Sequence, residues 1–350
     1  LEDLGGGNYR WEYTGMGEYL LSGSSYFIQV YGEDRAGNVQ TLLAGCTFWF
    51  DNEEPDSFVQ LPEDASPHKF YTSLLTISGT SYDATAGVDK VELHIRDVAE
   101  DKPYSGSDTW GSVGTTNYIL IGNLSSGGTF WYYTDVPNWI QGKRYRVSSR
   151  ATDKVVLPSA NVESSLSTRF TVIDSSAPSS TLITPAPTAD TKYRSLTQLT
   201  GAALDYPLET ATTFKSGLEK VEVLIQNLSL DSTYYWSTGE GWKEGEPADW
   251  PDATLSVSGD DVKPWRYPSS EWGTQPWTSG RRYKVTIRSR DNLGTYQSPV
   301  TSTTFIFDNT PPTSQITRPA DGADYSLNDP LSTISGTAVD HHSLNAGFHK

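Results

Sequence analysis

The sequence repeats one series of motifs three times, and this repetition restricts the fold more than any other feature. In the first motif a glycine precedes a tyrosine by three residues, and an aspartate follows that tyrosine by eight. The second motif joins an aspartate to one or two prolines. Its aspartates, Asp51, Asp174 and Asp308, lie 123 and 134 positions apart. A chain that repeats at this interval is predicted to fold as successive domains rather than around one large core.

Two shorter motifs recur in the same order. A glycine within an Ile-Ser-Gly-Thr type of block is followed four residues later by an aspartate in each copy. A Trp-x-Tyr motif begins at Trp11, Trp131 and Trp265, shortly before each Gly-x-x-Tyr motif. The aspartates that follow the glycines are Asp83, Asp205 and Asp340. Chance does not produce four motifs in one order, so the repeat is a strong signal.

Alternation within these motifs predicts β-strands. Apolar residues occupy every second position, and no stretch has a helical period. We therefore predict an all-β fold of tandem immunoglobulin-like β-sandwich repeats. Tyr145 and Tyr283 open their strands as the tyrosine of a tyrosine corner does, with its hydroxyl bonded back to the chain. The alternating positions are Tyr145 and Val147; Tyr283, Val285 and Ile287; Val91, Leu93 and Ile95; and Val221, Val223 and Ile225.

Domain boundaries are expected at the Asp-Pro motifs. We predict the C-terminal half of a repeat in residues 1–53, whole repeats in 54–175 and 176–309, and the N-terminal half of a repeat in 310–350. The third of these segments carries a tryptophan-rich insertion. The two halves raise the hypothesis that successive subunits complement each other head to tail in a filament. The alternative is a fragment of a longer chain.

The combined motifs resemble those of bacterial Ig-like repeats. The motifs that carry the resemblance are SGT-x-x-D, GV-x-KVEV-x-I, Trp-x-Tyr, G-x-x-Y-x-V-x-x-R-A-x-D-x-x-GN and F-x-x-D-N-x-P-P. Residues 153–156 lack the Gly-Asn of their turn, and Ser175 stands where the other copies have Asn. Such repeats fill large surface adhesins and fibre proteins, so the resemblance implies an extracellular stalk, adhesin or filament. With one cysteine and no intrachain disulfide, the chain fits a bacterial or archaeal surface protein, or an intracellular one. The expected partners are the chain itself, neighbouring repeats or surface glycans.

Charge and cysteine content narrow the function further. The net charge of −17 argues against nucleic-acid binding, which needs basic patches. An acidic surface collects divalent cations or serves solubility alone, and both alternatives stay open. The single Cys46 excludes an intrachain disulfide, and its strand context predicts a buried, inert thiol. We expect no membrane insertion in this segment, because it has no run of about 18 apolar residues.

Calcium is the one metal that the residues suggest. Related Ig-like arrays often bind Ca²⁺ near domain junctions through Asp and Asn oxygens, and the resemblance implies the same here. The alternative is turn chemistry, in which Asp and Asn bond to their own backbone. The candidate ligands are Asp34, Asp51, Asn52, Asp174, Asp291, Asp308 and Asn309.

Tryptophans in the insertion are candidates for contact with glycans or proteins. We expect Trp131 and Trp265 in the sandwich cores, whereas Trp242, Trp250 and Trp272 lie in polar stretches and are the contact candidates. Such contacts would suit the alternative function, a carbohydrate-binding accessory region of a secreted hydrolase. The glycosylation candidates are Asn123 and Asn227, each in an Asn-x-Ser sequon.

Catalysis has little support in the sequence. None of the five histidines belongs to a motif that pairs it with a nucleophile or a metal ligand. We therefore predict a non-catalytic protein with no catalytic residues, no organic cofactor and at most Ca²⁺.

Overall fold

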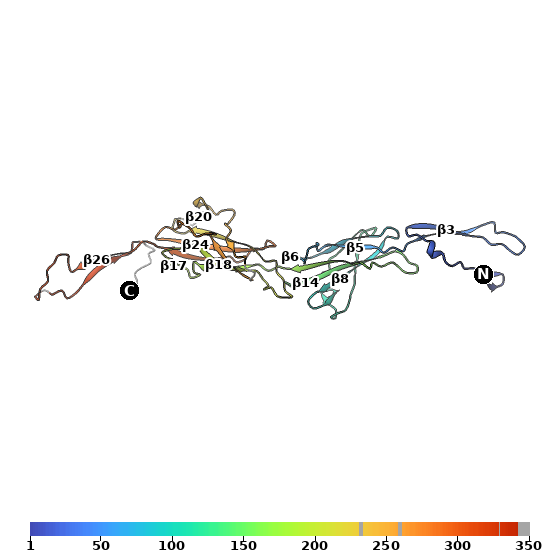
Figure 1. The fold of residues 1–350 in the computed structure, drawn as a ribbon, viewed down its shortest axis with the longest axis horizontal. Coiled ribbons are helices and arrows are strands. Elements are labelled where there is room, and N and C mark those ends of the chain that lie inside the picture. The colour runs from blue at the N-terminus through green and yellow to red at the C-terminus, as the bar shows by residue number, and fades with distance from the viewer. Residues whose placement is uncertain (231–233, 258–260, 329, 342–350) are drawn as a thin grey trace. The chain divides into compact units, whose positions relative to one another are not determined.

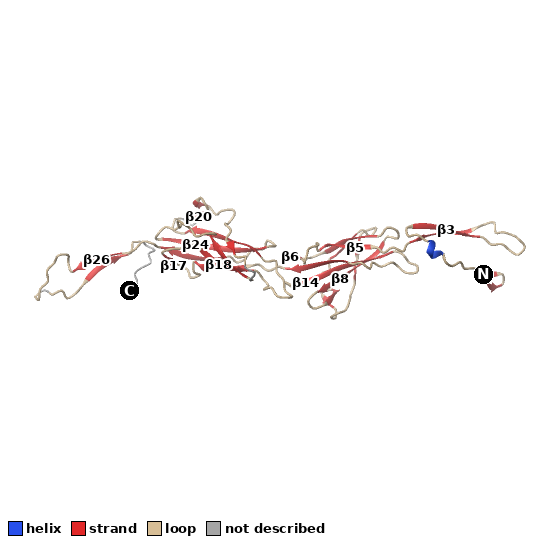
Figure 2. Ribbon diagram, in the orientation of Figure 1, coloured by secondary structure: helices blue, strands red, loops and turns tan. Residues whose placement is uncertain are grey.

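The computed structural model describes residues 1–230, 234–257, 261–328 and 330–341. Within them the backbone is strand, turn and loop, apart from the short 3-10 helix η1 (Met16–Tyr19) (Figure 2). Among the helices of the described residues, none is long and apolar enough to span a membrane. The chain divides into two compact units, Leu1–Ile173 and Asp174–Lys350.

The first unit contains a β-sandwich (Figure 1). In its larger sheet the strand order is β10 (Thr109–Trp110), β9 (Lys102–Gly106), β8 (Val88–Asp97), β14 (Arg144–Asp153), β15 (Ser167–Ile173) and β6 (Lys69–Tyr71), and β11 (Ile119–Leu120) also pairs with β8. In the smaller sheet the order is β12 (Asn123–Leu124), β13 (Phe130–Tyr133), β7 (Ile77–Tyr82) and β5 (Asp56–Leu61). One cluster of buried apolar side chains from both sheets forms the core.

The second unit contains a sandwich with the same plan. Its larger sheet has the order β21 (Gly241–Glu244), β20 (Tyr234–Ser237), β19 (Leu218–Asn227), β24 (Arg281–Asp291), β25 (Thr301–Phe307) and β17 (Thr191–Tyr193). Its smaller sheet has the order β22 (Thr254–Leu255), β23 (Val262–Tyr267), β18 (Leu199–Leu204) and β16 (Ser179–Thr184). The predicted fold class, an all-β chain with immunoglobulin-like sandwiches, is confirmed.

The remaining strands form three two-stranded sheets. These are β1 (Glu2–Gly5) with β2 (Asn8–Arg10), β3 (Ser24–Val30) with β4 (Ala44–Phe50), and β26 (Thr313–Arg318) with β27 (Ser335–Val339). The predicted segments 1–53, 54–175, 176–309 and 310–350 stay predictions, and the last nine residues of the fourth lie outside the described part of the chain.

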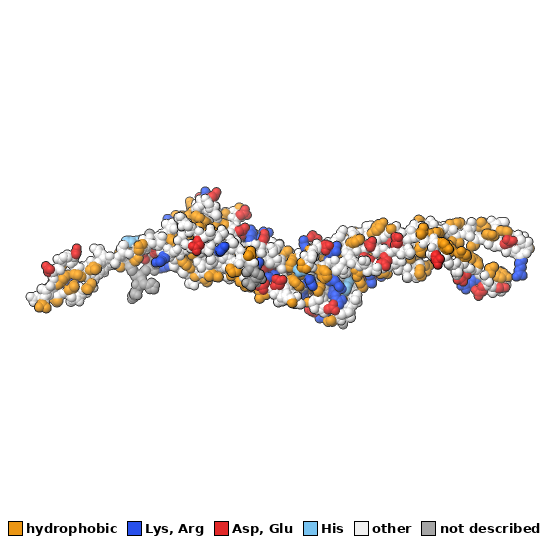
Figure 3. Space-filling model, in the orientation of Figure 1, with side chains coloured by type: hydrophobic (Ala, Val, Ile, Leu, Met, Phe, Trp, Pro, Cys, Tyr) orange, Lys and Arg blue, Asp and Glu red, His pale blue; other side chains and the backbone are white. Residues whose placement is uncertain are grey.

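The prediction of a buried thiol is wrong, because Cys46 is exposed. It lies on β4, which pairs only with β3 among the described strands, so no second sheet covers it. Figure 3 shows hydrophobic side chains on the surface of the segment that holds β3. Phe27 on β3 and Trp49 on β4 have 64% and 71% of their surface exposed.

Alternation places the predicted residues in the cores. Tyr145 and Val147 on β14, and Tyr283, Val285 and Ile287 on β24, are completely buried. The inward residues of the neighbouring strands β8 and β19 are buried as well. The period of two therefore identified the buried face of both central strands correctly.

The tyrosine corner is confirmed in all three copies of its motif. The hydroxyl of Tyr145 accepts a hydrogen bond from the backbone N–H of Ile140 at 3.0 Å. Tyr283 accepts the N–H of Thr278 at 2.8 Å in the same way. Tyr26 accepts the N–H of Leu21, also five residues upstream, at 2.7 Å. Tyr145 and Tyr283 thus bury their rings, whereas Tyr26 is half-buried, and the hydroxyl of each closes the turn before its strand.

A buried polar network also recurs between the sheets. In the first sandwich the hydroxyl of Ser57 donates to the Glu163 carboxylate at 2.6 Å, and Ser149 lies within hydrogen-bond distance of Ser57. In the second sandwich Ser180 and Ser289 donate to the side-chain oxygen of Gln297. Burial raises the pKa of Glu163, whereas the neutral Gln297 has no charge to bury.

Candidate functional site

Three carboxylates meet at one place in the second unit, and we call them the Asp205 cluster. Asp174 precedes β16, Asp205 follows β18, and Asp291 is the last residue of β24. One carboxylate oxygen of each lies within 4.8 Å of those of the other two. At most 1% of the surface of each residue is exposed. Oxygen ligands from three separate segments are the donor set that hard divalent cations prefer.

Backbone N–H groups hold two of these carboxylates in place. Asp174 accepts the N–H of Ser216 at 2.6 Å. Asp205 accepts the N–H of Gly217 at 2.7 Å. The loop before β19 therefore fixes both carboxylates and satisfies part of their hydrogen-bonding capacity.

Asp291 is satisfied on one side only. Its Oδ1 accepts the backbone N–H groups of Leu293 and Thr295 at 2.9 and 2.7 Å. Its Oδ2 is buried and has no hydrogen-bond partner. A carboxyl oxygen without a partner is costly to bury, which indicates that another group belongs at this position.

The electrostatics of the cluster agree with its geometry. Burial raises the pKa of Asp205 to about 6, and the like charges of Asp174 and Asp291 contribute to the rise. Three carboxylates at this separation repel one another, so the cluster favours either a proton or a cation.

The first unit has a corresponding group, which we call the Asp83 cluster: Asp51, Asp83 and Asp153. Asp153 is buried, whereas Asp51 and Asp83 are half-buried. Asp51 accepts the N–H of Ala86 at 3.0 Å, as Asp174 accepts that of Ser216. The two clusters are therefore equivalent positions of the repeat.

Only three of the seven predicted ligands lie in a cluster. In the first unit Asp51 lies with Asp83 and Asp153, and in the second unit Asp205 lies with Asp174 and Asp291. We did not predict Asp83, Asp153 or Asp205 as ligands. A sequence signal was present for Asp83 and Asp205, because both follow the repeated glycine by four residues. Asp153 has the same place in its motif as Asp291.

The other four predicted ligands lie outside both clusters. Asp34 accepts the side-chain amide and backbone N–H groups of its own turn, which is the alternative of turn chemistry. Asp308 accepts the hydroxyl of Ser279 at 2.9 Å. Asn52 and Asn309 are exposed. Their role as ligands stays a prediction.

The candidate tryptophans pack largely inward. Trp242 stacks on Tyr283 with ring centroids 5.4 Å apart, and Trp272 meets Trp277 edge to face at 5.2 Å. Both are partly buried against the second core. Trp250 lies under the guanidinium group of Arg288, 4.3 Å from the ring centroid. None of the three is a fully exposed platform, and their contact with glycans stays a prediction.

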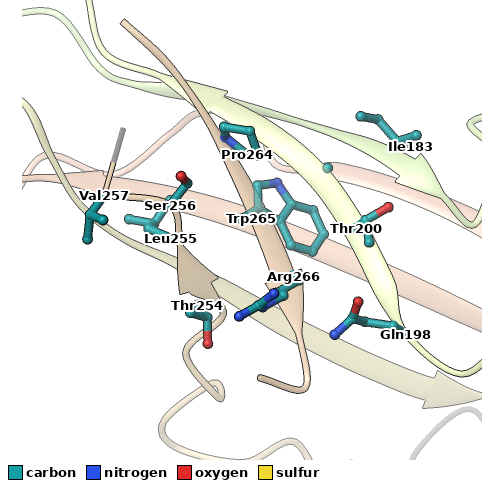
Figure 4. Close-up of a pocket in the computed structure, with 11 residues that line it drawn as sticks. Ile183, Gln198, Thr200, Thr254, Leu255, Ser256, Val257, Pro264, Trp265 and Arg266 are labelled. Atoms are coloured by element: carbon teal, nitrogen blue, oxygen red, sulfur yellow. The ribbon is translucent and has the colours of Figure 1, made fainter. Parts of the chain in front are cut away.

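Trp265 and Trp131 are core residues, with 2% and 0% of their surface exposed. Trp265 borders a pocket of about 580 Å³ in the smaller sheet of the second sandwich. Figure 4 shows its indole between Thr200 and Leu255. Among the described lining residues Arg266 is the only charged one, and none is a carboxylate or a histidine that could transfer protons.

The two sequons differ in accessibility. Asn123 is exposed on β12. Asn227 is 1% exposed, and its side-chain oxygen accepts the N–H groups of Ser229 and Leu230. Glycosylation of the two asparagines stays a prediction, and at Asn227 it is disfavoured because the side chain is buried and closes a turn at the end of β19.

Comparison with known proteins gives fold likeness only. The sequence matches no protein-family model. It also matches no curated protein sequence. Among solved structures, a protocadherin gammaB4 extracellular domain aligns with a TM-score of 0.34 and 15% identity, covering 92% of this chain and 46% of the other.

Two further structures align over most of the chain. One belongs to a 1.5-MDa bacterial ice-binding adhesin, with a TM-score of 0.28, 12% identity, and coverage of 83% of this chain and 76% of the other. The other is murine CEACAM1b, with a TM-score of 0.26, 9% identity, and coverage of 72% and 100%. These likenesses are weak, and the fold assignment rests on the strands described above.

Proposed function

We propose that this chain is part of a non-catalytic extracellular array of sandwiches that serves as a stalk or a surface filament, with a structural or adhesive role. The observation that carries the proposal is the repetition of one sandwich, in the same strand order, within one chain. Repeated modules supply length and many equivalent surfaces rather than one reactive cleft. The partners in this role are neighbouring repeats or further copies of the chain, and the location is a bacterial or archaeal surface.

The strand pairing suits a protein under tension. In each sandwich an early strand pairs in parallel with the last one: β6 with β15, and β17 with β25. Pulling on the two ends of a sandwich draws such strands in opposite directions along their length. Their hydrogen bonds are then loaded together rather than one after another, so the pair resists extension.

The inward packing of the tryptophans favours this role over the carbohydrate-binding alternative. Sugar rings stack on solvent-facing aromatic surfaces, whereas Trp242 and Trp272 direct ring faces and edges toward other core aromatics. The smaller sheet of the first sandwich does expose aromatic residues, so glycan binding there stays the alternative. These residues are Phe58, Tyr82, Phe130 and Tyr132 on β5, β7 and β13.

Stretching the full chain from its two termini tests the proposal. We expect two separate unfolding events, because each sandwich has its own core. Each sandwich spans about 120 residues, so each event should lengthen the chain by about 400 Å at up to 3.6 Å per residue. Single-molecule force spectroscopy measures both quantities.

The variant Phe70→Pro checks which strands bear the load. Proline removes a backbone donor from β6, so the force of one event should fall while the other, which depends on β17 and β25, stays unchanged. A chain that extends without resistance, or two events that both ignore Phe70→Pro, would contradict a load-bearing role.

A further inference from the structure

The two aspartate clusters differ in one side chain. In the Asp83 cluster it donates a hydrogen bond to a carboxylate oxygen, and we call an oxygen that is satisfied in this way closed. In the Asp83 cluster, Nδ2 of Asn161 donates to Oδ2 of Asp153 at 2.7 Å, and its backbone N–H donates to Oδ1. The corresponding residue beside Asp291 is Thr295, whose backbone N–H makes the equivalent bond to Oδ1. No amide reaches Oδ2 of Asp291, which is the buried oxygen without a partner.

The same closure occurs a third time, in a turn of matching length. Asn38 follows Asp34 by four residues, as Thr295 follows Asp291. The Nδ2 of Asn38 donates to Oδ2 of Asp34 at 2.7 Å, and its N–H donates to Oδ1. An asparagine is therefore the group that closes this oxygen in two copies of the motif, and the second sandwich lacks it.

The charged groups beside the two clusters also differ, and the difference again favours a cation at the Asp205 cluster. The ammonium group of Lys154 lies beside Gly87, 3.6 Å from where a Cβ on that glycine would lie, and Gly87 donates to Asp83. Beside the equivalent Gly217 stands the neutral Asn292. Lys215 also lies near the Asp205 cluster, where it contacts the backbone carbonyl of Asp205, but its ammonium group is paired with the carboxylate of Asp261.

We propose that the Asp205 cluster binds one Ca²⁺ ion, and that the Asp83 cluster, closed by Asn161, does not. Three buried carboxylates and one oxygen that lacks a partner form a hard, anionic donor set, which a divalent cation neutralises. Ca²⁺ fits better than Mg²⁺, because it accepts irregular sets of six to eight oxygen ligands, whereas Mg²⁺ demands an octahedron. This site is independent of the proposed structural role.

Calorimetric titration of the full chain, freed of metal with a chelator, tests the site. CaCl₂ and MgCl₂ are titrated separately at pH 7.5, and the thermal unfolding midpoint is measured with and without each ion. We expect one Ca²⁺ per chain, at least tenfold weaker binding of Mg²⁺, and a rise in the unfolding midpoint of the second sandwich when Ca²⁺ is present.

Three variants separate the two clusters. Asp205→Asn should abolish Ca²⁺ binding, whereas the matched control Asp83→Asn should leave it unchanged. Thr295→Asn rebuilds the turn seen at Asp34 and Asn38, so it should fold normally and weaken Ca²⁺ binding at least tenfold by closing Oδ2 of Asp291.

The outcomes that would overturn the proposal are equally definite. They are the absence of Ca²⁺ binding to the unaltered chain, equal affinity for Mg²⁺, equal loss of binding in Asp83→Asn and Asp205→Asn, or unchanged affinity in Thr295→Asn. A chain that binds no Ca²⁺ would mean that protons alone relieve the repulsion among the carboxylates. Circular dichroism confirms that each variant is folded.

Discussion

Replacing Gly79 with alanine should destabilise the first sandwich by about 3 kcal/mol or more, the largest effect that we expect from one methyl group. The reason is the contact between Gly79 and the core tryptophan. A Cβ at this position would lie 1.9 Å from the carbonyl oxygen of Phe58 and 2.3 Å from the ring of Trp131. Neither can yield easily, because one is the backbone of β5 and the other is completely buried.

The equivalent Gly201 shows that this contact belongs to the repeat. Its Cβ would lie 2.0 Å from the carbonyl oxygen of Thr181 and 2.4 Å from the ring of Trp265. The glycine of the Ile-Ser-Gly-Thr block is thus present because the tryptophan of the Trp-x-Tyr motif lies across it. Two motifs that are separate in sequence are two sides of one contact.

Urea unfolding followed by hydrogen exchange, which assigns stability to each sandwich, measures this effect. Gly79→Ala should weaken only the first sandwich, and Gly201→Ala only the second. Gly122→Ala is the control, since no heavy atom lies within 4 Å of its added Cβ, and it should change stability by no more than about 0.5 kcal/mol. If Gly79→Ala resembles this control, the packing described here is wrong.

Acid should also destabilise the first sandwich, through His94. The expected loss of stability is nearly as large as that caused by Gly79→Ala. The side chain is 3% exposed on β8. Burial, together with the positive charges of Arg146 and Arg96, lowers its pKa to about 4 from the ordinary 6.5. In the unfolded chain the same histidine takes up a proton near pH 6.5.

The sign of the effect follows from these two values. Between pH 6.5 and 4 the unfolded state binds more protons than the folded state, so stability falls as the pH falls through this window. At 1.36 kcal/mol for each tenfold change in proton affinity, the loss amounts to roughly 3 kcal/mol by pH 4. Above pH 6.5 His94 contributes no pH dependence.

His94→Leu isolates this contribution from the titration of carboxylates in the same range. Leucine already occupies the equivalent position of the second sandwich, where Leu224 is 7% exposed. We expect the variant to unfold at similar urea concentrations at pH 7 and to lose less stability than the unaltered chain at pH 4.5. Parallel losses in the two proteins would show that His94 does not cause the acid sensitivity.

The strands and their buried faces could be predicted from the sequence, because both depend on neighbouring residues. Alternation identified Val147 and Val285 as core residues, and the spacing from Gly to Tyr identified the tyrosine corners. Where the exposure of a side chain depends on segments that are distant in the sequence, it could not be predicted. Cys46 has the pattern of a core residue, but no second sheet among the described strands covers it, and Asn227 has a sequon but a buried side chain.

The aspartate clusters show the same limit. Asp83 and Asp153 are 70 positions apart and come together because β7 and β14 end at the same place in the sandwich. The regular recurrence of Asp83 and Asp205 was visible in the sequence, but the three-residue set was not. The difference between Asn161 and Thr295 acquires meaning only when the hydrogen bonds to Asp153 and Asp291 are compared.

Electron microscopy of the source cells, with antibodies raised against the two sandwiches, tests the central claim most directly. If the chain belongs to a structural array, the label should lie outside the cell on fibres or rods, and averaging along them should show beads the size of one sandwich. Label confined to the cell interior, or on surface particles with no repeat along their length, would contradict it.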